Sequence, residues 1–229
     1  MAIIKLRDKN KGPVALVATG LFLITAIMYF MPVDIQSKIT IPVAIAAFAS
    51  LWLCPWEITL ALAFSALGDW AGSRSNFLMQ MSFFAIGHVW YITYFVKRYF
   101  MKVEPDFKLT SKAKGYFAMV ILCAIALLAV VFARIIPCAP AGIIRVGTGI
   151  YACLISTMLV MALLQRSSLY ALGAVLFVFS DFILAWNKFV DPIVYNRLLI
   201  MVPYYAAQWL LFIRSTPFRI APEMRLMRF

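Results

Sequence analysis

The chain has 229 residues, of which 65% are hydrophobic and only 13% are charged, and its formal net charge is +12. A soluble domain has about 45–50% apolar and about 25% charged residues, so this composition excludes a soluble protein and predicts an integral membrane protein. The basic residues gather in loops and tails, where they determine topology and favour anionic lipids, so nucleic-acid binding is not expected.

Eight apolar segments follow one another along the chain, each long enough or nearly long enough to cross a bilayer. The first is too long for a signal peptide and has no small-residue cleavage site. The second and third are short and are separated by Pro55, which ends one helix and can start the next. Merging those two segments would give a seven-span alternative. The predicted segments are 13–31, 39–54, 56–71, 77–96, 115–136, 141–164, 168–186 and 193–213.

Lysine and arginine are unevenly divided between the two sides of such a bundle. With the N-terminus inside, the cytoplasmic side carries 15 of the 21 basic residues and the other side carries six. Because basic loops stay in the cytoplasm, both termini are expected there. We expect one polytopic domain over 1–229, an all-α bundle of eight transmembrane helices, with two four-helix halves as an option and basic tails at 1–12 and 214–229. The short chain favours the inner membrane of a bacterium.

Two aspartates, Asp69 and Asp181, lie inside apolar segments. A charged side chain at the centre of a spanning helix costs about 2.5–3.5 kcal/mol on insertion scales, so these residues are functional candidates. Both are expected at similar depth in the outer half of the bilayer. The stretches 64–69 and 177–181 resemble each other weakly, which fits an internal repeat with a site between the halves. The alternative is that each carboxylate only pairs with a cation.

Other polar residues of the apolar segments could complete a site. His88, the only histidine, orients a carboxyl or water, or is hydrogen-bonded across helices; with the two aspartates it could also ligate a metal. Lys38 and Arg145, each at the start of a helix, are candidate ligands of a lipid phosphate or snorkelling anchors. The further candidates for substrate binding are Tyr151, Tyr204, Tyr205 and Gln208.

Motifs of the common hydrolases are absent from the sequence: it contains no GxSxG, HExxH, P-loop or Rossmann pattern. Ser65 or Ser180, close to the acids, could act as a nucleophile, although no nucleophile elbow supports this alternative. The four cysteines form no CxxC pair and mostly lie in apolar runs, so neither a disulfide framework nor a zinc site is expected.

Five stretches of the chain carry a family resemblance: FSALGDW, FFAIGHVWYITYF, IYACLISTM, GAVLFVFSDFILAWNKF and YYAAQWLLF. In order and spacing, from Lys38 to Leu211, they resemble the YhhN-type lysoplasmalogenase family, whose lysine–proline element is matched loosely by Lys38 and Pro42. The resemblance implies an eight-helix membrane hydrolase that cleaves the sn-1 vinyl ether of lysoplasmalogens into a fatty aldehyde and a glycerophospho-alcohol. It also implies no metal or organic cofactor, and a lysophospholipid and membrane lipids as partners.

Vinyl ether hydrolysis needs an acid that delivers a proton to carbon and an anion beside the oxocarbenium ion that forms. Two carboxyl groups in a low dielectric supply both, as they do in glycosidases. We therefore expect Asp69 and Asp181 to be the acid/base pair, assisted by His88 and by Tyr204 or Tyr205. The alternatives are a proton-coupled lipid or small-molecule transporter, a non-catalytic membrane protein and a hydrolase of lipid esters or amides.

Overall fold

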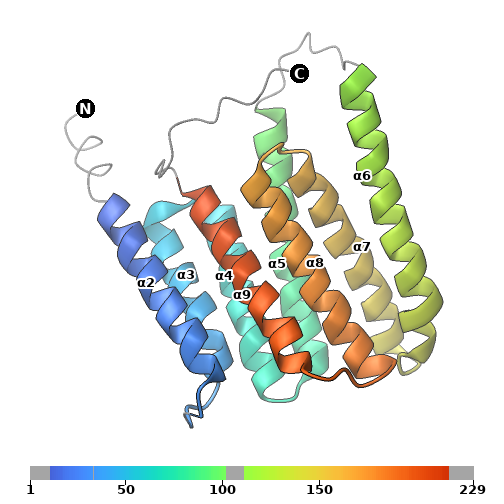
Figure 1. Cartoon of the computed structure of the whole chain (residues 1–229), viewed down its shortest axis with the longest axis horizontal. Helices are drawn as coiled ribbons and strands as arrows, with labels where there is room; N and C mark the ends of the chain where they lie inside the picture. Colours follow the sequence, from blue (N-terminus) through green and yellow to red (C-terminus); the bar gives the residue numbers. More distant parts are fainter. Residues whose placement is uncertain (1–10, 33, 102–110, 217–229) are drawn as a thin grey trace. The chain divides into compact units, whose positions relative to one another are not determined.

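A computed structural model describes residues 11–32, 34–101 and 111–216, and throughout these ranges the regular structure is helical (Figure 1). Each of the predicted apolar segments is a helix, so the all-α class is confirmed. The predicted tails, 1–12 and 214–229, lie almost entirely outside the described residues. The helices are α2 (Lys11–Phe30), α3 (Ile41–Leu53), α4 (Trp56–Ser73), α5 (Phe77–Phe100), α6 (Ser111–Val130), α7 (Ile143–Leu163), α8 (Ser168–Phe189) and α9 (Asn196–Ser215), with the short turns η1 (Lys38–Thr40), η2 (Val131–Ile135) and η3 (Ile136–Cys138).

Within the described ranges, five helical stretches are long and apolar enough to cross a membrane: α2, the stretch Gly115–Cys138, α7, α8 and α9. The stretch Lys38–Leu53 is apolar but shorter. Large apolar side chains cover much of the outside of these helices; Leu16 on α2, for example, is 74% exposed. Lipid is the solvent that suits such a surface, and the chain is a multi-pass integral membrane protein.

The chain divides into two compact units. Of the described residues, the first unit contains 11–32, 34–90 and 208–216, and the second contains 91–101 and 111–207. The boundaries fall inside α5 and inside α9. Neither unit therefore coincides with a predicted half of four whole helices.

In the first unit, proline separates α3 from α4 as the sequence predicts. Pro55 has no N–H to continue α3, and its carbonyl oxygen accepts hydrogen bonds from the backbone N–H groups of Ile58 and Thr59 at 3.0 and 3.3 Å. The Ser50 hydroxyl donates to Thr59 Oγ1 at 3.0 Å, which joins the two helices across the break. The second and third predicted segments are thus two separate helices.

A tight turn over residues 74–76 joins α4 to α5 in the same unit. Ser75 takes a left-handed conformation with φ 58°. Asn76 then caps α5, because its Oδ1 accepts a hydrogen bond from the backbone N–H of Met79 at 3.1 Å. This short connection makes α4 and α5 antiparallel neighbours.

In the second unit, α6 ends in an irregular way that opens space beside α7. The π-helical turn η2 is followed by the 3₁₀ turn η3, which contains Pro137. Proline cannot donate the next helical hydrogen bond, so the regular helix stops there. Gly142, with φ 93°, then reverses the chain direction in a conformation that side-chain-bearing residues rarely adopt.

Asn187 organises the connection from α8 to α9. Its Oδ1 accepts hydrogen bonds from the backbone N–H of Ile193 at 2.9 Å and from Asn196 Nδ2 at 3.0 Å. Asn187 therefore has a structural role at the helix end.

Candidate functional site

Glycines bring α4 and α5 into close contact in the first unit. A Cβ atom placed on Gly68 would lie 3.0 Å from the ring of Phe84, and one placed on Gly87 would lie 3.1 Å from the carbonyl oxygen of Ala61. Residue numbers rise along one helix as they fall along the other, so the contact is antiparallel. Small residues permit two helices to approach this closely.

Asp69 and His88 each directly follow one of these contact glycines. Their side chains are 2% and 1% exposed. One residue turns a helix by about 100°, and on antiparallel helices this rotation carries both following residues to the same side of the contact. Each Cβ also tilts toward the N-terminus of its own helix, so the two side chains lean toward one another. The aspartate and the histidine therefore share one side of the α4–α5 seam.

The imidazole ring of His88 is fixed by its own helix. Nδ1 lies 2.8 Å from the backbone carbonyl oxygen of Phe84. Because a carbonyl oxygen only accepts, Nδ1 carries the proton, and Nε2 of the neutral ring is an acceptor. A histidine held in this tautomer can orient a water molecule or a carboxylic acid group on the Asp69 side of the seam.

Lys38 lies near the end of α4 that carries Asp69. The hydroxyl groups of Ser37 and Ser73 are hydrogen-bonded at 2.8 Å, which holds η1 against the C-terminal turn of α4. Ser73 is one turn beyond Asp69 on the same helix face. Lys38 Nζ donates to the carbonyl oxygen of Met31 at 2.8 Å, just past the C-terminus of α2, where the helix dipole favours a cation. Lys38, the predicted phosphate ligand, thus also binds the backbone at the C-terminal end of α2.

In the second unit, Asp181 on α8 is paired with Tyr151 on α7. The Tyr151 hydroxyl donates a hydrogen bond to Asp181 Oδ2. Both side chains are partly buried. The tyrosine hydroxyl fixes one carboxylate oxygen, Oδ2. The other oxygen, Oδ1, has its own lone pairs and can accept further hydrogen bonds. Tyr151, which the sequence suggested only as a substrate ligand, is therefore a hydrogen-bond partner of Asp181.

Aromatic rings pack beside this pair. Phe177 precedes Asp181 by four residues and shares its face of α8. The Phe177 ring meets the Tyr204 ring edge-on, with centroids 5.5 Å apart. Tyr204 and Tyr205 are each 3% exposed. Gln208, the remaining polar candidate on α9, is fully buried and belongs to the first unit.

The serine hydroxyl groups beside the acids are bound to backbone. Ser65 Oγ donates to the carbonyl oxygen of Ala61 at 2.8 Å, and Ser180 Oγ donates to that of Ile200, also at 2.8 Å. Neither arrangement favours a nucleophilic serine. In the part of the chain that the structure describes, no three His, Cys, Asp or Glu side chains gather as a metal site.

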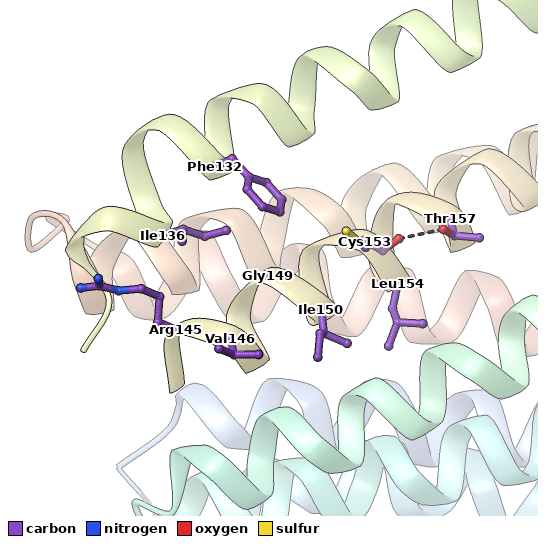
Figure 2. A pocket seen from close by; sticks show the side chains of 9 residues that line it. All are labelled: Phe132, Ile136, Arg145, Val146, Gly149, Ile150, Cys153, Leu154 and Thr157. Atoms are coloured by element: carbon purple, nitrogen blue, oxygen red, sulfur yellow. Dashed lines mark hydrogen bonds between the residues drawn. The ribbon is translucent and has the colours of Figure 1, made fainter. Parts of the chain in front are cut away.

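Arg145 lies at one end of a groove of about 590 Å³ in the second unit (Figure 2). Phe132 and Ile136 line one side of the groove, and residues of α7 line the other. Asp181 and Tyr151 do not line it, and Tyr151 points about 120° around α7 from Arg145. The sequence suggested Arg145, together with Lys38, as a ligand of the lipid phosphate, whereas the structure places Arg145 away from the Tyr151–Asp181 pair.

Sequence reasoning missed two features of these sites. The contact role of Gly87 was not recognised, although this glycine directly precedes buried His88. For Gly68 the sequence indicated the close approach of a neighbouring backbone, but not that α5 makes the contact. The Tyr151–Asp181 pairing was also missed, although a signal existed. The two residues lie at nearly equal distances from the short α7–α8 connection, which is the condition for meeting across an antiparallel hairpin.

The glycine contact yields a stability prediction. Gly87→Val is expected to lower the stability of the folded protein by about 1–3 kcal/mol, because the added side chain overlaps the Ala61 carbonyl of a tightly packed helix pair. Gly20→Val is the matched control, since a Cβ on Gly20 has nothing within 4 Å. Thermal unfolding of the two purified variants in detergent measures the difference. Equal midpoints would contradict the close contact.

Comparison with known proteins agrees with the motifs noted in the sequence. Residues 33–215 match the model of the YhhN family. The lysoplasmalogenase TMEM86B of Rattus norvegicus is 32% identical over 163 residues, which is 68% of this chain and 60% of that protein. TMEM86B of Sus scrofa is 32% identical over 155 residues, or 66% and 59% of the two chains. For TMEM86B of Mus musculus the identity is 54% over 43 residues, 19% of each chain.

These matches confirm the resemblance drawn from the sequence. The chain spans about three fifths of the length of the rat and pig proteins. No solved structure matches it.

Proposed function

This chain belongs to the YhhN family, and on that premise we propose that it is a membrane lipid hydrolase that cleaves the sn-1 vinyl ether bond of lysoplasmalogens. The products are a fatty aldehyde and a glycerophospho-alcohol. The observation that carries the proposal is the hydrogen-bonded pair of Tyr151 and Asp181 on apolar helices. A carboxyl group held in this way inside a membrane protein is a functional-site candidate. The names of the relatives point to the same reaction.

The proposed reaction adds one water molecule across the vinyl ether. An acid delivers a proton to the carbon that is β to the ether oxygen, and the positive charge is shared between the α-carbon and that oxygen. Water adds to the α-carbon and loses a proton, which gives a hemiacetal. The hemiacetal collapses to an aldehyde and expels the glycerol oxygen as an alcohol. The step through the cation requires one proton donor and benefits from one anion, as in glycoside hydrolysis.

We assign the two carboxyl groups different roles. Asp181 is the carboxylate that faces the developing positive charge, because a hydroxyl group that donates to Oδ2 suits the ionised form. Asp69, 2% exposed, is the proton donor, and His88, fixed through Nδ1, is its positioning partner. Tyr151 positions Asp181. This assignment follows from the chemistry of each residue's surroundings within its own unit.

Substrate recognition is assigned to the remaining polar residues. Lys38 is proposed to hold the lipid phosphate, because η1 is held at the Asp69 end of α4. Tyr204 and Tyr205 are proposed to contact the substrate with their hydroxyl groups, and Gln208 with its amide. Arg145 is not assigned to this phosphate, because it lies at the end of a separate groove.

We also propose that all eight helices cross the bilayer, with both termini in the cytoplasm and the protein in the inner membrane of a bacterium. The distribution of lysine and arginine supports this orientation. A single cysteine introduced in either tail of a variant whose four native cysteines are replaced by serine would then be labelled only from the cytoplasmic side of sealed vesicles. Labelling of one tail from outside would contradict the eight-span arrangement.

The function is tested with three lysolipids that differ only in the sn-1 linkage. The purified protein is expected to release a long-chain aldehyde from the vinyl ether and nothing from the saturated alkyl ether, which has no carbon to protonate. In D2O the aldehyde should carry one deuteron on the carbon next to the carbonyl group. Release of fatty acid from the 1-acyl lipid would instead identify an ester hydrolase, and lipid flux in proteoliposomes without aldehyde would identify a transporter.

A further inference from the structure

The groove between the end of α6 and α7 is built by backbone features of both helices. The π-helical turn η2 presents Phe132, and Ile136 follows in η3. Opposite them lies Gly149: a Cβ there would sit 3.6 Å from Ile136 Cδ1 and 3.8 Å from Phe132 Cζ. The missing side chain of Gly149 therefore widens the groove, whose volume of about 590 Å³ falls in the range of ligand pockets.

The groove opens toward lipid. Two of the α7 residues that line it, Val146 and Ile150, are 63% and 58% exposed. The buried residues of α7, such as Ile155 and Leu159, lie on the opposite face of the helix. From Arg145 to Thr157 the lining extends over about 18 Å of helix, close to the thickness of one leaflet's hydrocarbon layer, about 15 Å.

A fixed guanidinium group closes one end of this apolar groove (Figure 2). Arg145 Nε and Nη2 donate to the carbonyl oxygen of Ala139 at 3.0 and 2.7 Å, and Nη2 also donates to that of Pro137 at 3.2 Å. These bonds hold the plane of the guanidinium. Among the described residues no acceptor is bound to Nη1, so its two N–H groups are available to an anion.

The local charge also favours an anionic ligand. The sequence contains no aspartate or glutamate between Asp106 and Asp181. The groove end thus carries positive charge without a neighbouring acid in the same helical hairpin, which favours an anionic headgroup.

We infer that this groove is a binding site for an anionic phospholipid of the bilayer, distinct from the reacting site. Its phosphate binds the Nη1 edge of Arg145, and one of its acyl chains lies along α7 over Gly149 toward Cys153. The site depends on headgroup charge, on the exposed guanidinium edge and on the absence of a side chain at position 149.

The test is lipid binding to the purified full-length protein, measured by native mass spectrometry. Phosphatidylglycerol and phosphatidylcholine with identical acyl chains are titrated separately. The wild-type protein is expected to retain one phosphatidylglycerol about tenfold more tightly than phosphatidylcholine. Arg145→Gln should remove that preference. Gly149→Leu should remove the bound lipid. If Gly149→Leu does not fold, Cys153→Trp takes its place, because it fills the groove away from Arg145 and should also remove the lipid.

Two matched controls separate a defined site from general lipid adhesion. Arg134→Gln removes the same charge without lining the groove, and Gly20→Leu adds the same side chain where nothing lies within 4 Å. Both should bind phosphatidylglycerol within about twofold of wild type. The inference is overturned if the two lipids bind equally, if Arg134→Gln loses as much affinity as Arg145→Gln, or if groove-filling variants keep the lipid. Competitive displacement by a lysoplasmalogen would overturn the separate identity of the site.

Discussion

Asp181→Asn is expected to lower kcat for vinyl ether cleavage by about 10²–10⁴-fold and to change KM only a few-fold. Asparagine keeps the shape of the side chain and can still accept a hydrogen bond from Tyr151 through its amide oxygen. It carries no charge, so the cation that forms on the substrate loses its stabilising anion. Release of aldehyde from a lysoplasmalogen by the purified variant, in the same detergent as wild type, measures the loss.

Asp191→Asn is the control for this variant. Asp191 is exposed in the connection between α8 and α9, so the same substitution there should leave kcat unchanged. If Asp181→Asn retains wild-type turnover while its unfolding midpoint is also unchanged, Asp181 is not the catalytic anion.

Asp69→Asn is expected to lower kcat by a similar factor, about 10²–10⁴, through loss of the proton donor. The variant Asp69→Asn/Asp181→Asn should lose little more than either single variant, because groups that serve one step are not additive. Asp34→Asn, in the exposed segment before η1, is the matched control. Steady-state aldehyde release under identical conditions provides all four rates.

The two roles can be separated by chemical rescue. Acetate added to Asp69→Ala should restore part of the rate in its protonated form, so the rescue should fall as pH rises. Rescue of Asp181→Ala should depend on the anion and rise with pH. The opposite pattern would exchange the roles of the two carboxyl groups.

Much of the fold could be predicted because the apolar segments end at residues with clear local effects. Pro55 separates α3 from α4, and Asn76 caps α5 as a short polar residue between two apolar runs. The helices nevertheless continue further than hydropathy suggests. α5 reaches Phe100 and α8 reaches Phe189, because the backbone hydrogen bonds of a helix continue into the polar boundary where basic residues are tolerated.

The candidate site could be predicted only in part, because contacts between helices depend on which face each residue occupies. Asp69, His88 and Asp181 stand out as polar residues in apolar segments. The direction of a side chain such as Arg145 follows from the backbone carbonyl groups of the preceding turn, which no residue pattern encodes. The π-helical turn that opens the groove depends on local backbone geometry before Pro137, which the residue pattern does not predict.

The glycine contacts between α4 and α5 also bear on biogenesis. In the proposed eight-span arrangement, a translocon that released these helices singly would expose Asp69 to acyl chains, at a cost of about 2.5–3.5 kcal/mol for a charge at the helix centre. The three-residue turn lets the hairpin close first and shield Asp69 and His88 along its seam. We therefore expect co-insertion of the two helices, so that Gly87→Val lowers the yield of integrated chain in a microsomal insertion assay.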